Sequence, residues 1–443
     1  MNFSRRQALL STLFGTGMVG LRALATGLPV SLLLDPRKAL ADPGGCAASG
    51  KAQYIVFNTS MQGDPINANC PGTYEDPNIN HPLDPAMAAT KFTMSGKTYT
   101  AAKPWSTLPQ NVLDRTLFFH LMTGTPVHPR ERDVLELMGG SSQGGSEMLP
   151  SLLAKAVAPC LGTIQAQPVS LGAGTPAEAL TFGGNIMPTM QPTALKDTLT
   201  NPAGPLTKIQ ALRDQTMNQI YGIYKNVATP PQQQFIDSLV TSQNQARELN
   251  QSLLSQLSAL KDDTYQSQLS AALVLIQLNV APVLAVHIDF GSDNHGDPGL
   301  AGETAAHVSA LAALGTFMQS LESAGLQDKV TFMSLNVFGR SLANNPNGRT
   351  HNGNHHVSLC IGKPFRGGTI GGCAPVLGDY GCTSINSSTG AGGAGGDIQA
   401  ADTLSAFAQT MLAAVGGNPT VVGTSTSIAG ASTTGKLVTA ALA

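Results

Sequence analysis

Five short apolar runs, none of which alternates cleanly between apolar and polar residues, constrain the fold of this chain more than any other feature. They are Gln53–Asn58, Thr116–Met122, Pro282–Phe290, Val330–Val337 and His356–Ile361. Several are rich in Val, Ile and Phe, which favour strands. A strand without alternation buries side chains on both faces, as in a parallel sheet between helices. The sequence therefore predicts an α/β protein with a doubly wound, mainly parallel sheet and flanking helices.

Helical patterns lie between and after these runs. Thr304–Ala324 has apolar residues at helical spacing and lies between two predicted strands, so we expect a crossover helix there. Ala401–Val415 is expected to be a second helix, ended by Gly416-Gly417. The region from about residue 205 to 278 is rich in Gln, Ser and Leu, and we interpret it as a helical cap insertion. A dimerising coiled coil is the alternative, although its apolar spacing is irregular for sustained heptads.

The first 41 residues are typical of an export signal. Arg5-Arg6 is followed by a moderately apolar stretch, and Ala39-Leu40-Ala41 offers a cleavage site with small residues. This pattern predicts a twin-arginine signal, with the twin-arginine translocase as a partner during export. We expect cleavage after Ala41 and a periplasmic or secreted α/β domain of residues 42–443. A membrane anchor that is never cut is the alternative.

Charge and hydropathy exclude other classes of protein. The chain has 25 Lys and Arg against 27 Asp and Glu. It has no basic run and no interleaving of basic and aromatic residues, so nothing predicts nucleic-acid binding. No second stretch is long and apolar enough to cross a bilayer, so we expect no stable membrane span after cleavage.

The chain has six cysteines, an even number that allows disulfide bonds in an exported protein. Cys373 and Cys382 flank a loop that contains Gly and Pro, and they are the pair that we expect to be bonded. No Cys-x-x-Cys motif is present, which argues against a zinc site built from thiolates.

Three of the predicted strands end directly in polar loops. The first leads to Asp64, the third to Asp293–Asp297 and the fourth to Arg340. The segment Arg349–His356, which holds three of the nine histidines, follows soon after. Ligands of doubly wound sheets bind beyond the carboxyl ends of the strands. We therefore expect these loops to share one rim.

Imidazole and carboxylate groups on this rim predict a site for a divalent metal ion, with zinc, manganese and calcium all open. The candidate ligands are Asp64, Asp293, His295, His351 and His355. Such an ion could polarise a phosphoryl or sulfuryl oxygen and lower the pKa of bound water. Arg340 is the candidate catalytic contact to an oxyanion, and Arg349 could assist it.

The polar loops also have a plainer interpretation, because Asn and Gly often hydrogen-bond the backbone of their own loop. His287 is expected to lie in the core. His307 is expected to pair with Glu303, since the two are four residues apart on one predicted helix. His81 and His120 are left unassigned.

Several motifs resemble an exported bacterial family, domain of unknown function 1501, within the alkaline-phosphatase-like superfamily. The resemblance runs along most of the mature chain, in the family's order and spacing. The matching segments are Gln62-Gly63-Asp64, Val127–Arg132, Gly291–His295, Asn336–Ser341, Thr350-His351 and His355-His356. The resemblance implies an alkaline-phosphatase-like fold and a metal-dependent hydrolase of phosphate or sulfate esters, with a small anionic ester as substrate.

Two departures from the family pattern keep a second function open. Val337 stands where the family has Glu, and Thr350 stands where it has Asp; a one-residue gap would put Arg349 there instead. Fewer carboxylates neutralise less metal charge, which weakens a two-metal site most. No nucleophile can be named from the sequence. The alternative is a non-catalytic exported binding or assembly protein that keeps the fold.

Overall fold

The computed structural model describes residues 50–139, 147–200, 251–422 and 436–443, apart from 164, 173–179, 184, 188 and 292, and a few positions between 219 and 233. The predicted export signal and most of the predicted cap lie outside the described residues, so both stay predictions. No helix in the described part of the chain is long and apolar enough to cross a membrane.

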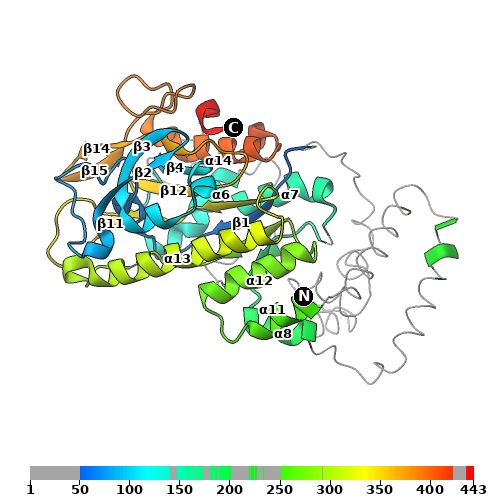
Figure 1. Cartoon of the computed structure of the whole chain (residues 1–443). Coiled ribbons are helices and arrows are strands. Elements are labelled where there is room, and N and C mark those ends of the chain that lie inside the picture. Colours follow the sequence, from blue (N-terminus) through cyan, green and yellow to red (C-terminus); the bar gives the residue numbers. More distant parts are fainter. Residues whose placement is uncertain are drawn as a thin grey trace, which may run out of the picture.

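A seven-stranded sheet forms the centre of the described chain (Figure 1), in the order β13-β4-β12-β9-β1-β8-β5. Its strands are β1 Tyr54–Asn58, β4 Thr116–Leu121, β5 Val169–Ser170, β8 Val283–Val286, β9 Val330–Ser334, β12 His356–Ile361 and β13 Gly368–Ile370. All five predicted strands are therefore present. The two that the sequence analysis missed are the short edge strands β5 and β13.

Two-stranded hairpins surround this sheet. They pair β2 Ala89–Met94 with β3 Lys97–Ala102, β6 Thr181–Phe182 with β7 Asn185–Ile186, β10 Gly339–Arg340 with β11 His351–Asn352, and β14 Cys373–Val376 with β15 Asp379–Cys382. The α-helices are α4 Ile66–Asn69, α5 Gln110–Leu113, α6 Glu131–Gly139, α7 Leu149–Leu161, α8 Pro192–Thr200, α11 Gln251–Ala259, α12 Tyr265–Gln277, α13 Ala301–Ser323 and α14 Thr403–Ala414. The predicted crossover helix is α13, and the predicted later helix is α14.

Helices cover both faces of the sheet, which is why its strands lack alternation. Successive residues of β1 enter different cores: Val56 packs in the cluster with α12 and α13, whereas Ile55 and Phe57 pack in the cluster with α7 and α14. Figure 1 shows the sheet between α13 and α14. The prediction of a mainly parallel sheet between helices is confirmed.

One strand departs from the parallel order. β1 pairs in parallel with β8 and β9, but β12 is antiparallel to both of its neighbours, β9 and β4. His356, the first residue of β12, is paired with Leu121, the last residue of β4. The start of β12 therefore lies at the edge where the parallel strands end, and the histidine-rich segment reaches the rim for this reason.

The predicted disulfide is wrong in this structure. Cys373 and Cys382 are paired across the β14–β15 hairpin, but both are free cysteines. The thiol of Cys373 donates to the carbonyl oxygen of Gly72, and that of Cys382 donates to the carbonyl oxygen of Ala400. Each thiol thus contacts a backbone acceptor instead of the other thiol. Cys160, in contrast, is disulfide-bonded.

A buried ion pair joins the start of α13 to the histidine-rich segment. Arg349 Nε donates to Glu303 Oε2 at 2.7 Å, and neither side chain is exposed. The same carboxylate accepts from the amides of Asn69 and Asn294, at 2.8 and 2.6 Å. Asp297 accepts from the backbone N–H groups of Gly302 and Glu303 in the first turn of this helix.

Two sequence predictions are corrected by this pair. Arg349 also donates to backbone carbonyls, so it is used to hold the fold and is not placed to clamp an anion. His307 does not pair with Glu303. It is buried, with ring contacts to Trp105 and Phe290.

We expect Arg349→Met to lower the free energy of unfolding by about 3–5 kcal/mol, because it leaves a buried carboxylate without its charge partner. Arg115→Met is the matched control, since Arg115 pairs with Asp328 at a half-exposed site. That control should cost about 1 kcal/mol or less. Urea unfolding followed by the fluorescence of Trp105, the chain's one tryptophan, measures both. Equal losses would contradict the prediction.

Buried histidines make the stability depend on pH. Burial lowers the pKa of His81 and His120 to about 4, and that of His307 and His356 to about 3. The unfolded chain, with histidine pKa values of about 6.5, takes up protons that the folded protein excludes. The stability that comes from keeping these histidines neutral is therefore lost as the pH falls below about 6.5. Burial raises the pKa of Asp64 to about 7, which acts in the opposite direction, but the histidines outnumber it.

We therefore expect the free energy of unfolding to fall between about pH 7 and pH 5. One excluded histidine contributes up to about 1.4 kcal/mol per pH unit. His307→Phe, a ring that suits the aromatic site, should reduce the slope of stability against pH by about that amount. Urea unfolding at three pH values measures the slope. A slope that His307→Phe leaves unchanged would show that this histidine does not contribute.

Candidate metal centre

The β10–β11 hairpin places Arg340 beside the histidine-rich segment. Its register pairs Arg340 with His351 and Gly339 with Asn352. Gly339 also forms a bridge with Asp64, in the loop after β1. The segments that were predicted to share a rim are thus adjacent at the carboxyl ends of β1 and β9.

Four side chains on this rim converge: His128, Asp293, His295 and His351. Each offers one ligand atom, and these atoms all lie within 4.8 Å of one another. Asp293, His295 and His351 were predicted as ligands from the sequence. His128, which lies in the short 3-10 helix η3 (His128–Arg130), was not. We call these four residues the metal cluster.

Backbone carbonyls orient two of the imidazole rings. His128 Nδ1 lies 2.8 Å from the carbonyl oxygen of Met61, and His351 Nδ1 lies 2.7 Å from that of Pro126. A carbonyl only accepts, so each ring carries its proton on Nδ1 when neutral. The lone pair of each Nε2 is then left for the cluster. Metal-binding histidines are commonly oriented in this way.

The atoms of the cluster are close enough for one small ion. The Nε2 atoms of His295 and His351 are 2.6 Å apart. Asp293 Oδ1 lies 3.6 Å from His128 Nε2 and 3.7 Å from His295 Nε2. Two nitrogens bound to tetrahedral zinc, with bonds of about 2.0–2.1 Å, would be about 3.3 Å apart. Small rotations of the two rings would therefore complete such a site.

The histidines of the cluster are held in the form that binds metal. Burial, helped by the positive charge of Arg340, lowers the pKa of His351 to about 4. The same two causes lower the pKa of His295. Both rings are therefore neutral at neutral pH, as metal coordination requires. Asp293 has a φ of 53°, in the left-handed region that few residues other than Gly adopt.

Arg340 lies beside the cluster with unused donors. Its side chain is fully buried, and Nη2 donates to the carbonyl oxygen of Gln62 at 2.6 Å and lies 3.5 Å from Asp293 Oδ1. Its Nε and Nη1 have no hydrogen-bond partner among the described residues. Burial lowers the pKa of this guanidinium. Buried donors without partners are rare in proteins, so these two nitrogens are an unusual feature of the site.

The structure places two predicted ligands outside the cluster. Asp64 is buried, where it accepts from the backbone N–H of Ile66 at 3.0 Å and from the amide of Asn336. His355 is also buried, with Nε2 3.0 Å from His120 Nδ1 and Nδ1 3.3 Å from the amide of Asn67. Both side chains are bonded to protein groups.

His128, the cluster residue that was not among the predicted ligands, could have been found from the strand pattern. It follows β4, whose carboxyl end lies on the same rim, and it falls in the Val127–Arg132 segment that entered the family resemblance. The predicted rim contained the loops after three strands only. The polar residues after the strand Thr116–Met122 satisfied the same rule.

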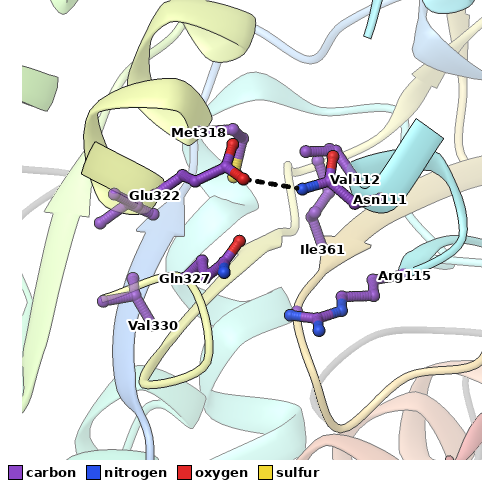
Figure 2. A pocket seen from close by; sticks show the side chains of 10 residues that line it. Asn111, Val112, Arg115, Met318, Glu322, Gln327, Val330 and Ile361 are labelled. Atoms are coloured by element: carbon purple, nitrogen blue, oxygen red, sulfur yellow. Dashed lines mark hydrogen bonds between the residues drawn. The ribbon is translucent and has the colours of Figure 1, made fainter. Parts of the chain in front are cut away.

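A small hollow lies at the opposite edge of the sheet. Figure 2 shows Arg115, Glu322 and Gln327 around it. Its lining includes Val330, where β9 begins, and Ile361, where antiparallel β12 ends. At about 3.3 Å per strand residue, it is roughly 15 Å or more from the metal cluster. It is therefore not part of the candidate centre.

Comparisons with known proteins add little to this geometry. No family model matches the chain, and no curated protein matches it. One solved structure found is that of BT4656 in complex with its substrate D-glucosamine-2-N,6-O-disulfate. It is 12% identical, with a TM-score of 0.31, and the alignment covers 86% of this chain and 79% of that chain. The description of the fold therefore depends on the strand order and cores given above.

We expect purified protein to bind one zinc ion, and His351→Ala to bind it at least about 100-fold more weakly, because a ligand is lost. His287→Ala, a histidine outside the cluster, is the control and should bind zinc normally. Elemental analysis after dialysis, with a competing chelator, measures both. Equal zinc content in the two variants would contradict the assignment.

Proposed function

We propose that this protein is an exported, metal-dependent hydrolase of phosphate or sulfate esters with an alkaline-phosphatase-like fold. The observation that carries the proposal is the position of Arg340, whose Nη2 lies 3.5 Å from Oδ1 of Asp293 in the metal cluster. A cation site next to a free guanidinium suits an ester that carries negative charge on tetrahedral oxygens. The family resemblance and the mainly parallel sheet support the same conclusion.

Each residue has a defined task in this proposal. A metal ion held by His128, Asp293, His295 and His351 would polarise an ester oxygen and lower the pKa of a bound water. Arg340 would donate from Nε and Nη1 to ester oxygens and stabilise the charge that develops on them. The exposed edge of the cluster, where the side chain of Asp293 is 50% exposed, would admit a small anionic substrate.

The donor set narrows the choice of ion. Three imidazoles and one carboxylate suit zinc and similar transition metals. Calcium prefers six to eight oxygen ligands, which this cluster does not supply. Among the three ions that the sequence left open, we therefore propose zinc first, manganese second and calcium last.

Export is part of the proposal. Its support is the Arg5-Arg6 pair, the apolar stretch after it and the cleavable Ala39-Leu40-Ala41. We propose passage through the twin-arginine translocase and a final location in the periplasm or outside the cell.

A non-catalytic role as a metal-containing binding or assembly protein is the second candidate. The number of donors favours it, because four protein ligands fill a tetrahedral site, and such closed sites are typically structural. The exposure of Asp293 and the free donors of Arg340 favour catalysis. An assay of ester hydrolysis by the zinc-loaded protein separates the two.

We expect the zinc-loaded protein to hydrolyse at least one ester in a panel of aryl phosphates and aryl sulfates. Arg340→Ala should reduce kcat/KM by about 100-fold or more, because a donor to the developing oxyanion is lost. Its zinc content should stay unchanged, since Arg340 is not a ligand. Arg115→Ala, at the opposite edge, is the control. Full metal loading with no turnover on the whole panel would favour the non-catalytic role.

A further inference from the structure

Asn67 in α4 binds both backbone groups of Arg340. Its Oδ1 accepts from the backbone N–H of Arg340 at 2.9 Å, and its Nδ2 donates to the carbonyl oxygen of Arg340 at 2.8 Å. Asn67 and Arg340 are both fully buried. A Cβ on Gly339 would lie 2.8 Å from Cγ of Asn67 and 2.3 Å from the carbonyl oxygen of His355. This close approach therefore requires glycine next to Arg340.

Two buried histidines, His355 and His120, extend the hydrogen bonds of Asn67 into a chain whose donors all point the same way. Oδ1 of Asn67 accepts from a backbone N–H, so the other atom of its amide is the donor Nδ2. Nδ2 lies 3.3 Å from both His355 Nδ1 and the carbonyl oxygen of His355, and beside this donor Nδ1 can only accept. The proton of neutral His355 is then on Nε2, 3.0 Å from His120 Nδ1. His120 Nε2 in turn donates to the carbonyl oxygen of Pro71, 3.1 Å away.

Every polar atom in this chain of hydrogen bonds has a partner, and the chain has a single direction from Asn67 to Pro71. Such a fully satisfied buried network is rigid. The guanidinium of Arg340, in contrast, makes one short contact of its own, from Nη2 to Gln62. The position of the guanidinium thus depends strongly on where the backbone of Arg340 is held.

We propose that Asn67, His355 and His120 form a positioning network that holds the guanidinium of Arg340 beside the metal cluster, where its Nη2 lies 3.5 Å from Asp293 Oδ1 and where it would act on a substrate anion. The role toward the anion rests on the proposed function, whereas the hydrogen-bond network does not. His355, predicted from the sequence to be a metal ligand, is a positioning residue in this interpretation. Supporting residues of this kind hold reacting groups within a fraction of an ångström of their place.

The network is tested first in the unaltered protein. NMR of the full chain labelled with ¹⁵N-histidine should show His120 and His355 as neutral rings that both carry the proton on Nε2. In Asn67→Asp the donor to His355 is lost, so the protons of both rings should move from Nε2 to Nδ1: His355 then donates to the new carboxylate, and His120 donates to Nε2 of His355. Asn185→Asp, the same change on exposed strand β7, should alter neither ring. A proton on Nδ1 of His355 in the unaltered protein overturns the network.

The positioning role is tested with inorganic phosphate as the probe, titrated into zinc-loaded protein. We expect Asn67→Asp to bind phosphate about tenfold more weakly or worse, with its zinc content unchanged. Asn185→Asp should bind as the unaltered protein does. A switch of the His355 proton without loss of phosphate affinity overturns the positioning role. Failure of unaltered, zinc-loaded protein to bind phosphate overturns the anion site itself, and the histidine spectra would still report on the network.

Discussion

The buried pair of Glu303 and Arg349 is the constraint on which the rim of this protein depends. Two buried charged side chains are tolerated only if they form an ion pair and their remaining donors and acceptors have hydrogen-bond partners. The pair meets this condition because the amides of Asn69 and Asn294 donate to Glu303 and two backbone carbonyls accept from the guanidinium of Arg349. The backbone carbonyl of Asn294 also accepts from the backbone N–H of Arg349. Asn294 lies between Asp293 and His295, and Arg349 is two residues before His351. One ion pair therefore fixes two of the segments that form the metal cluster.

The geometry of this junction excludes side chains where the two segments cross. Gly348 has a φ of +125°, and a Cβ on it would lie 2.2 Å from the carbonyl oxygen of Asn294. The reversal of β12 complements the junction, because it brings the end of the histidine-rich segment back into the sheet at the rim. The ion pair and the reversed strand thus define the path of the segment from both ends.

Much of the fold followed from local patterns. Runs such as Val330–Val337 and the helix at Thr304–Ala324 were predictable, because burial on one or two faces leaves a direct mark on the order of apolar residues. The direction of β12 was not predictable, because a parallel strand and an antiparallel strand can have the same run of apolar residues. Cys373 and Cys382 were correctly found to be neighbours, yet the orientation of two thiols is decided by nearby carbonyls that the sequence does not reveal.

The candidate site was likewise predictable in part. The rule that ligands lie beyond strand ends found Asp293, His295 and His351, because it needs only the strands and their order. It could not show that His355 is hydrogen-bonded to Asn67 and Asp64 to Asn336, because each partner is distant in sequence. Residue type and spacing indicate which groups can bind a metal. Which of them are free to do so depends on long-range partners.

The metal cluster joins parts of the chain that are far apart, because His128 and Asp293 are separated by more than a third of its length. An ion bound there would act as a cross-link that closes a very long loop. Its affinity would be coupled to folding, since the four side chains meet only after distant strands have paired. The fraction of chains that hold the ion would then report how many molecules have completed their slowest, most non-local contacts.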